Sequence, residues 1–219
     1  HRRRNDWFSQ GRMIADKAFK KNRGKFYSGR GGYYINLARS KDRRAKAEKE
    51  IHKTREKIER FEAVDGGGGN SGVLSNAEIG CLKSHYNVLL QTPYEVTIIL
   101  EDDFELCNDF DSKLQQCLSE LPADFSALWL GGRLVGNPEN YSANLYKIKA
   151  ITGTYGYIVR SSFIPSLLIQ LAKGNKIADW AMCAAFDDKV FKTKENLVLH
   201  KAGHSIIKGQ YVDYKDLRA

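Results

Sequence analysis

The sequence lacks several features that would have fixed its class at once. No apolar run approaches the roughly 18–20 residues that a membrane-spanning helix needs, and the longest strand-like apolar stretch is Val96–Leu100. No apolar core follows His1–Arg4, so no secretion signal is expected. The four cysteines form no Cys-x-x-Cys pair, which argues against a zinc site or a redox pair and favours a reducing compartment. We therefore expect a cytoplasmic protein, either free or peripheral to a membrane.

Two nucleotide-binding fingerprints are also missing. The sequence contains neither Gly-x-Gly-x-x-Gly after a strand nor Gly-x-x-x-x-Gly-Lys-Ser/Thr. This excludes the simplest Rossmann dinucleotide and P-loop interpretations. The sequence shows no internal repeat either, so a solenoid or propeller is not expected.

What the chain does have is an uneven charge. Its 219 residues carry a net charge of +9, and 42% of them are apolar, as is usual for one folded domain. Residues 1–60 hold 20 Lys and Arg against 7 Asp and Glu, a net charge of +13. Residues 61–219 hold 15 against 19, a net charge of −4. A uniformly basic nucleic-acid binder is therefore disfavoured.

The basic beginning of the chain reads as an arm. Residues 5–20 place Trp7, Ile14 and Phe19 largely on one helical face, which predicts an amphipathic helix that docks on its own domain, on a partner or on a membrane surface. Residues 20–32 combine basic side chains with glycines and read as a linker. We therefore expect an N-terminal arm over residues 1–32 and one globular domain over residues 33–219.

In the globular region strands alternate with helices. A capping-box pattern at Ser75–Glu78 opens one of the helices, Ser40 is a candidate cap for another, and Val96–Leu100 has the continuous apolar pattern of a strand buried on both faces. The alternation predicts an α/β domain with a mostly parallel central sheet. Strands are expected at 33–37, 58–64, 96–100, 128–130, 145–150, 155–159 and 197–200, and helices at 41–57, 76–90, 110–121 and 163–173.

Three adjacent carboxylates, Glu101, Asp102 and Asp103, follow the buried strand directly. Like charges this close repel one another unless a cation neutralises them. The carboxyl ends of the strands line the ligand crevice in open α/β sheets, and hard oxygen ligands favour Mg²⁺ or Mn²⁺. The triplet therefore indicates either a divalent-metal site or a solvated acidic turn.

Basic residues follow the first expected strand, which ends in Asn36-Leu37. Among them are Arg39, Arg43 and Arg44. Parallel strands would place them at the same edge as the acidic triplet, where arginines and a helix N-terminus suit a diphosphate. The alternative is a charged surface helix, which is the expected role of most of residues 46–60.

An ordered set of motifs extends over residues 33–210. In order along the chain these motifs are Tyr34–Leu37 with Arg39 and Arg43-Arg44, Arg60–Gly66, Leu74-Ser75 with Glu78–His85, Ile99–Asp103, Gly153–Ile158, Asp179-Trp180 and Ser205-Ile206. The set resembles glycosyltransferase family 25, which includes lipooligosaccharide and collagen galactosyltransferases. The sequence departs from the family pattern in a short glycine-rich loop at residues 66–72, a brief segment between residues 131 and 146, and the N-terminal arm.

The resemblance implies a GT-A type nucleotide-binding fold. It implies transfer of a hexose from a UDP-sugar to a hydroxyl group of a glycan or glycoprotein, and galactose is the expected hexose. The transfer is expected to proceed with inversion and to need Mn²⁺ or Mg²⁺. In this reading the Glu-Asp-Asp motif binds the metal: Asp103 is the most direct ligand, and Glu101 or Asp102 reaches the metal or the donor ribose. The expected donor-binding residues are Asn36, Leu37, Arg39, Arg44, Ser84, His85 and Asp102.

Inversion needs a base near the acceptor hydroxyl, usually a carboxylate. Asp179 is the first candidate, with Trp180 beside it to stack on a sugar, and its alternative role is a helix N-cap. Asp188 is the second candidate, and its alternative role is a surface turn. A late histidine is a further metal-ligand candidate, and we choose His204 over His200 because it adjoins the Ser205-Ile206 match.

Other roles for these residues remain open. His85 has a packing role or a donor contact, and Cys81 is expected to be structural because its helix is apolar. The rival to the enzyme is a catalytically silent, glycosyltransferase-like binding or assembly protein, which the short loops and the arm suggest. In a third hypothesis the arm binds nucleic acid or anionic lipid.

Overall fold

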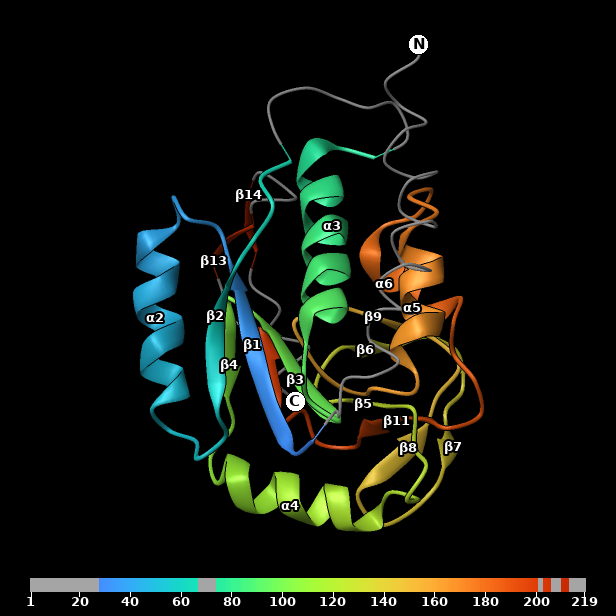
Figure 1. Ribbon diagram of the computed structural model, residues 1–219. Helices are drawn as coiled ribbons and strands as arrows, with labels where there is room; N and C mark the ends of the chain where they lie inside the picture. Colours follow the sequence, from blue (N-terminus) through green and yellow to red (C-terminus); the bar gives the residue numbers. More distant parts are fainter. Residues whose placement is uncertain (1–27, 67–73, 201–202, 206–209, 213–219) are drawn as a thin grey trace.

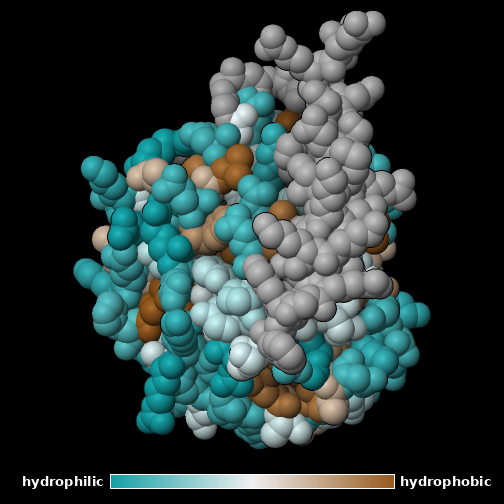
Figure 2. Space-filling view, in the orientation of Figure 1, coloured by the Kyte–Doolittle hydropathy of each residue, from teal (hydrophilic) through white to brown (hydrophobic). Residues whose placement is uncertain are grey.

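The computed structural model describes residues 28–66 and 74–200, together with the backbone of two short strands at 203–205 and 210–212 (Figure 1). The predicted amphipathic helix at 5–20, most of the glycine-rich loop and the side chain of His204 lie outside these residues. Within the described part, no helix is both long enough and apolar enough to cross a membrane. In Figure 2 the described surface on this side of the molecule is mainly hydrophilic, with hydrophobic residues in small patches.

An eight-stranded sheet forms the centre of the domain, with the strand order β2-β1-β3-β10-β5-β11-β8-β7. β1 pairs in parallel with β2 and β3, and β5 with β11, whereas β10 and β8 are antiparallel to each of their neighbours. Six of the eight strands therefore point in one direction, which confirms the predicted α/β domain with a mostly parallel sheet. The strands are β1 (Arg30–Asn36), β2 (Ile58–Glu62), β3 (Val96–Glu101), β5 (Ala127–Trp129), β7 (Glu139–Asn140), β8 (Leu145–Lys147), β10 (Gly156–Arg160) and β11 (Val190–Thr193).

Helices cover both faces of the sheet (Figure 1). One face, which we call the α3 face, packs against α3 (Asn76–Gln91), α5 (Ile164–Leu171) and α6 (Ala178–Cys183). The other, which we call the α2 face, packs against α2 (Lys41–Ile51), α4 (Phe110–Glu120) and a small sheet of β4 (Phe104–Leu106) with β12 (Val198–His200). Two further hairpin-like pairs are β6 (Arg133–Leu134) with β9 (Ile151–Thr152), and β13 (Gly203–Ser205) with β14 (Gln210–Val212).

β3 carries both hydrophobic cores. Ile99 belongs to the core cluster on the α3 face, and Ile98 and Leu100 belong to the cluster on the α2 face. All three side chains are fully buried, as predicted for a strand covered on both sides. Because side chains alternate along a strand, the acidic residues that follow β3 begin with Glu101 on the α3 face and Asp102 on the α2 face.

Local signals at the helix ends were partly correct. The predicted capping box is present: the Ser75 hydroxyl accepts a hydrogen bond from the Glu78 amide, and the Glu78 carboxylate accepts one from the Ser75 amide at 2.7 Å. Ser40 is the N-cap of α2 but makes no side-chain capping bond. α2 also ends at Ile51 rather than at residue 57, because the Asp111 carboxylate of α4 binds the Thr54 hydroxyl and the next amide, which holds the chain in another conformation.

The first strand begins earlier than the sequence indicated. β1 starts at Arg30, which pairs in register with Val96 and donates a hydrogen bond to Glu56 at 2.9 Å. A Cβ atom on Gly32 would lie 2.3 Å from the Ile98 carbonyl oxygen, so glycine permits the close approach of β1 to β3. Residues 30–32 therefore belong to the sheet and not to the predicted linker.

Candidate active site

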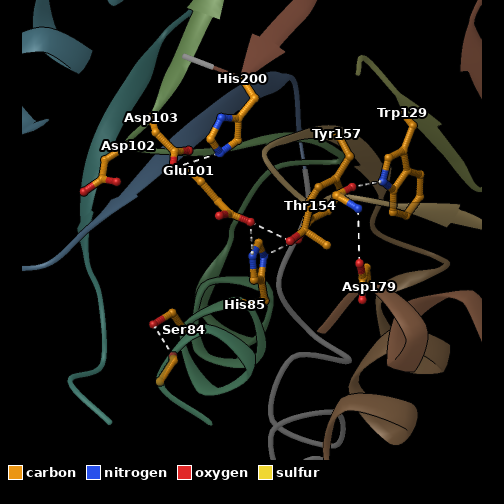
Figure 3. Close-up of polar contacts among 12 residues, drawn as sticks. Ser84, His85, Glu101, Asp102, Asp103, Trp129, Thr154, Tyr157, Asp179 and His200 are labelled. Atoms are coloured by element: carbon orange, nitrogen blue, oxygen red, sulfur yellow. Dashed lines mark hydrogen bonds and ion pairs between the residues drawn. The ribbon is translucent and has the colours of Figure 1, made fainter. Parts of the chain in front are cut away.

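The candidate site lies where β1 and β3 leave the sheet at their carboxyl ends. Asn36 ends β1 and Glu101 ends β3, and Asp102 and Asp103 form the turn into β4. β10 runs antiparallel to β3, so the segment before it, residues 153–155, meets the same edge. The structure thus brings the end of β1, the acidic triplet and the Gly153–Tyr155 segment together (Figure 3).

Asp102 is held on the α2 face by two neighbours. Its Oδ2 accepts a hydrogen bond from Asn36 Nδ2 at 2.6 Å, and its Oδ1 lies 2.7 Å from Arg43 Nη2. Asn36 is itself fixed, because its Oδ1 accepts a hydrogen bond from Arg60 Nε at 3.1 Å. Asn36 and Asp102, both predicted to contact the donor, therefore form one buried unit at the ends of adjacent strands.

Asp103 contacts Arg43 and His200 through one carboxylate oxygen, whereas its other oxygen has no partner among the described residues. Its Oδ2 pairs with the Arg43 guanidinium and lies 3.2 Å from His200 Nε2. Its Oδ1 is buried and has no hydrogen-bond partner among the described residues. A buried carboxylate oxygen without a partner is costly, so this atom is the point of the site at which a ligand would be most strongly favoured.

The pKa shifts follow from these contacts. Burial raises the pKa of the Asp102 carboxyl to about 6, although Arg43 and Asn36 act in the opposite direction. Burial alone would also raise the pKa of Asp103, but the hydrogen bond with His200 and the charge of Arg43 outweigh it and lower that pKa. Desolvation disfavours the imidazolium of His200, yet its pair with Asp103 raises the pKa of the ring. Both shifts therefore favour the charged forms of Asp103 and His200.

Glu101 is directed to the α3 face (Figure 3). Its Oε1 accepts a hydrogen bond from Thr154 Oγ1 at 2.5 Å and lies 3.2 Å from His85 Nε2. The other ring nitrogen of His85, Nδ1, lies 3.0 Å from the Tyr157 hydroxyl. His85 is fully buried, so it has the predicted packing role and also lies against the acidic triplet, while its donor contact stays a prediction.

The Gly153–Tyr155 segment links the two faces. Thr154 binds Glu101, and the Gly153 amide donates a hydrogen bond to Asp179 Oδ2 at 3.2 Å. The Tyr155 ring packs edge-on against His200, with 5.5 Å between ring centroids. Gly153 has a φ of +96°, a conformation that only glycine adopts without strain. This backbone therefore positions groups on both sides of β3.

Ser84 has a structural position. Its hydroxyl accepts a hydrogen bond from the Val64 amide at 2.8 Å and donates one to the Gly80 carbonyl. A Cβ atom on Gly80 would lie 2.8 Å from the Val64 carbonyl oxygen. Gly80 and Ser84 therefore dock the segment after β2 on α3, and the donor contact of Ser84 stays a prediction.

Arg43, and not the predicted Arg44, reaches the acidic residues. Arg44 is exposed on α2 and pairs with Glu48 at 2.8 Å, one turn further along the same helix. Arg39 is exposed in the turn after β1 and pairs with Asp65, and Leu37 is half-buried at the start of that turn. Leu37 and Arg39 thus lie beside the site, whereas Arg44 points to a different neighbour.

The late histidine in contact with the site is His200. The register of β12 with β4 pairs His200 with Phe104, next to Asp103 in the chain. The backbone of His204 lies in β13, opposite Tyr211 of β14, and its side chain is outside the described residues. His200, the alternative candidate, therefore lies beside Asp103, and the metal-ligand role of a late histidine stays a prediction.

The two predicted bases lie in different places. Asp179 is in the first turn of α6, where Ile177 rather than Asp179 is the N-cap, and its Oδ2 faces the Gly153 amide. Asp188 is exposed in the turn before β11. β11 points in the same direction as β3. Asp188 precedes β11 and therefore lies at the amino ends of these strands, whereas the candidate site lies at the carboxyl ends. The structure therefore brings Asp179, and not Asp188, to the candidate site.

The residues around Asp103 are compatible with a hard divalent ion. The unpartnered Oδ1 is a carboxylate oxygen, the ligand type that Mg²⁺ and Mn²⁺ prefer. However, Arg43 already pairs with Asp102 and Asp103, so part of the repulsion between these two carboxylates is offset without a metal. Glu101 faces His85 and Thr154 instead of joining Asp103, which separates two of the predicted metal ligands.

Comparisons with known proteins agree with the motif pattern. The chain is 27% identical to procollagen galactosyltransferase 2 of Homo sapiens over 158 residues, which is 58% of this chain and 25% of the relative. The mouse protein of the same name is 26% identical over 153 residues, 57% of this chain and 24% of the relative. The chain thus matches about a quarter of the length of these curated relatives.

A solved structure and a family model complete the comparison. The structure of a Drosophila β1,4-galactosyltransferase 7 mutant with manganese, UDP-Gal and xylobiose aligns with a TM-score of 0.46 and 11% identity, covering 85% of this chain and 77% of that chain. A likeness at this level establishes neither substrate nor metal for this chain. The model of glycosyltransferase family 25 (LPS biosynthesis protein) matches residues 31–152, which is more than half of the chain. The chain therefore belongs to glycosyltransferase family 25.

Proposed function

We propose that this chain is a GT-A type glycosyltransferase domain that moves a hexose from a UDP-sugar to a hydroxyl group of a glycan or glycoprotein, and that this hexose is galactose. We propose further that the reaction depends on Mn²⁺ or Mg²⁺ and inverts the anomeric centre. The observation that carries this proposal is the buried, unpartnered Oδ1 of Asp103, next to Asp102 at the carboxyl end of β3. Family membership supports the reaction class, and the similarity to procollagen galactosyltransferases supports galactose.

On the α2 face we assign donor binding. Asp103 would hold the metal through Oδ1, with Asp102 as the neighbouring carboxylate. When bound, a divalent ion supplies a Lewis acid that offsets the negative charge developing on the departing diphosphate. His200 and Arg43 orient the Asp103 carboxylate through Oδ2, which leaves Oδ1 available. Arg43 is also close enough to supply a guanidinium to a phosphate.

On the α3 face we assign the acceptor. Asp179 is the proposed base, which takes the proton of the acceptor hydroxyl as that oxygen attacks the sugar. The Gly153 amide holds one oxygen of this carboxylate, and the same segment carries Thr154, which binds Glu101. Trp180 follows in the chain and is 40% exposed, so its ring is available to stack on a sugar. Donor and acceptor would then approach from opposite sides of the β3 end.

The first test is hydrolysis and transfer of UDP-galactose with added Mn²⁺. Asp103→Asn keeps the shape of the side chain and removes its charge, and we expect it to lower the rate about 100-fold or more, the scale of losing one transition-state contact. Asp102→Ala combined with Asp103→Ala should abolish the reaction. The matched control is Asp124→Asn, an exposed carboxylate that pairs with Lys189 far from the site. Full activity in the double variant would refute the metal assignment.

The role of Asp179 as the base is tested by comparing substitutions of two aspartates. Asp179→Asn should lower kcat by about 100-fold, the usual contribution of a general base, and leave UDP binding unchanged. Asp188→Asn, at the opposite sheet edge, should keep the wild-type rate. Equal effects of the two substitutions would remove Asp179 from its assigned role.

One observation favours a second candidate function, a catalytically silent binding or assembly protein. Arg43 pairs with both Asp102 and Asp103, so these buried charges are partly offset without a metal. A scaffold that no longer binds a metal would be stabilised by such a pairing. In this case neither Mn²⁺ nor UDP would bind, and no nucleotide sugar would be hydrolysed.

A further inference from the structure

A second group of metal-ligating side chains lies on the α3 face. Cys81, His85 and Glu101 each offer one ligand atom, and these atoms all lie within 4.8 Å of one another. Among the described residues this is the one group of three or more His, Cys, Asp and Glu side chains that is so close. Cys81 and His85 are four residues apart on α3, which places them on one side of the helix. Strand alternation directs Glu101 toward them.

The surroundings of the group hold its ligands in place. The Tyr157 hydroxyl lies 3.0 Å from His85 Nδ1 and leaves Nε2 facing Glu101. Tyr157 is fully buried and stacks on Trp129, with 5.1 Å between ring centroids. Thr154 holds the Glu101 carboxylate at 2.5 Å. Outer partners of this kind orient the ligands in known metal sites.

The three donor atoms differ in kind from those around Asp103. One thiolate sulfur, one imidazole nitrogen and one carboxylate oxygen form a borderline-soft set that suits Zn²⁺, whereas carboxylate oxygens alone suit Mg²⁺ or Mn²⁺. A thiolate and a carboxylate also balance the charge of a divalent ion. Three protein ligands leave the fourth tetrahedral position of zinc open to water or to another ligand.

We propose that Cys81, His85 and Glu101 form a zinc-binding site, separate from the Asp102–Asp103 site, and that zinc bound there inhibits the enzyme. The inhibitory part rests on the proposed function. Zinc would draw the Glu101 carboxylate away from Thr154, and Thr154 lies in the segment that holds Asp179. The missing Cys-x-x-Cys pair argued against zinc in the sequence, but here the ligands come from one helical turn and one strand end.

The proton balance of binding is simple. Burial, together with Glu101 and the other nearby acids, keeps the pKa of the Cys81 thiol well above its usual range, so the free thiol carries its proton. Zinc binding forms the bond between Sγ and the metal and releases one proton from the thiol to solvent. The imidazole binds through a neutral nitrogen. No oxidant or reductant is required.

Cobalt is the probe for this site, because thiolate-bound Co²⁺ gives a charge-transfer band in the near ultraviolet. The full chain, stripped of metals by a chelator, should show this band with one equivalent of Co²⁺, and Zn²⁺ should abolish it. Cys81→Ser should remove the band. The matched control, Cys107→Ser, changes a half-buried thiol of the α2 face and should keep it. No band in the wild-type chain, or a band that survives in Cys81→Ser, would overturn the proposal.

The inhibitory part has its own measurement. In excess Mn²⁺, adding Zn²⁺ should lower the rate of UDP-galactose hydrolysis at least 10-fold in the wild-type chain and in Cys107→Ser. In Cys81→Ser, adding Zn²⁺ should leave the rate nearly unchanged. An equal fall in all three proteins would contradict inhibition through this site. If no hydrolysis occurs at all, the proposed function fails, while the cobalt spectrum still decides whether the site exists.

Discussion

At the end of β3, the carboxylates on the two faces of the sheet have different kinds of partner. On the α2 face, Asp102 and Asp103 are paired with the fixed charge of Arg43, and Asp103 also with His200. On the α3 face, Glu101 is hydrogen-bonded to a hydroxyl group and lies beside an imidazole. The acidic triplet is thus divided between the two faces of the sheet, because successive side chains of a strand point to opposite faces.

The largest expected effect comes from removing the cation of the α2 face. Arg43→Met leaves two largely buried aspartates facing each other, and we expect the free energy of unfolding to fall by about 3 kcal/mol at pH 7, the cost of breaking a buried pair. Urea denaturation measures it. Arg44→Met is the matched control on the same helix and should leave stability close to wild type, because its pair with Glu48 is exposed. Equal effects would mean that Arg43 does not neutralise the aspartates.

A buried lysine, Lys192, extends the comparison to a cation that donates hydrogen bonds to uncharged partners. Lys192 donates hydrogen bonds to the Thr193 carbonyl and to Asn196 Oδ1, and burial lowers the pKa of its ammonium group to about 8. Between pH 8 and about 10.5 the unfolded chain binds more protons than the folded one, so stability should rise with pH in this window, on the order of 2–3 kcal/mol. Below pH 8 this contribution should be constant.

The measurement is urea denaturation between pH 7 and 10.5. Lys192→Met should remove the rise, and Lys189→Met, at an exposed lysine paired with Asp124, should keep it. A rise that persists unchanged in Lys192→Met would assign it to other groups.

The smallest expected effect comes from removing the hydrogen bond between Tyr157 and His85 on the α3 face. Tyr157→Phe removes the hydroxyl that fixes His85, and we expect a loss of about 1–2 kcal/mol, because a buried ring nitrogen is left without its partner. Tyr34→Phe, which removes a hydrogen bond to the partly exposed Glu48 on the α2 face, should cost less. Thermal unfolding of the two variants measures the difference. The reverse order of the two losses would show that His85 is not held by Tyr157.

Much of the framework was readable in the sequence because its signals are local. The capping box at Ser75 and the apolar run before Glu101 each fix an element within a few residues, and both were found where predicted. The position of the acidic triplet at the carboxyl end of a central strand followed from these elements. Asn36 was predicted from the family motif, and the structure places it against Asp102.

The sequence did not show which of two similar residues contacts the candidate site. Arg43 and Arg44 are adjacent on a helix with charges on many sides, so its sequence does not show which side faces the sheet. The contact of His200 with Asp103 depends on the pairing of β12 with β4, and the distance of Asp188 from the candidate site depends on the direction of β11. These are long-range contacts, for which spacing along the chain carries no signal.

The central claim, that the α2 face is a metal-assisted nucleotide site, is tested most directly by calorimetric titration of UDP into the chain with and without Mn²⁺. The account predicts that UDP binds in the presence of Mn²⁺, that binding is lost without the metal and in Asp103→Asn, and that Cys81→Ser on the α3 face retains it. Binding of UDP that is equally tight without Mn²⁺ and in Asp103→Asn, or no binding under any of these conditions, would contradict the account.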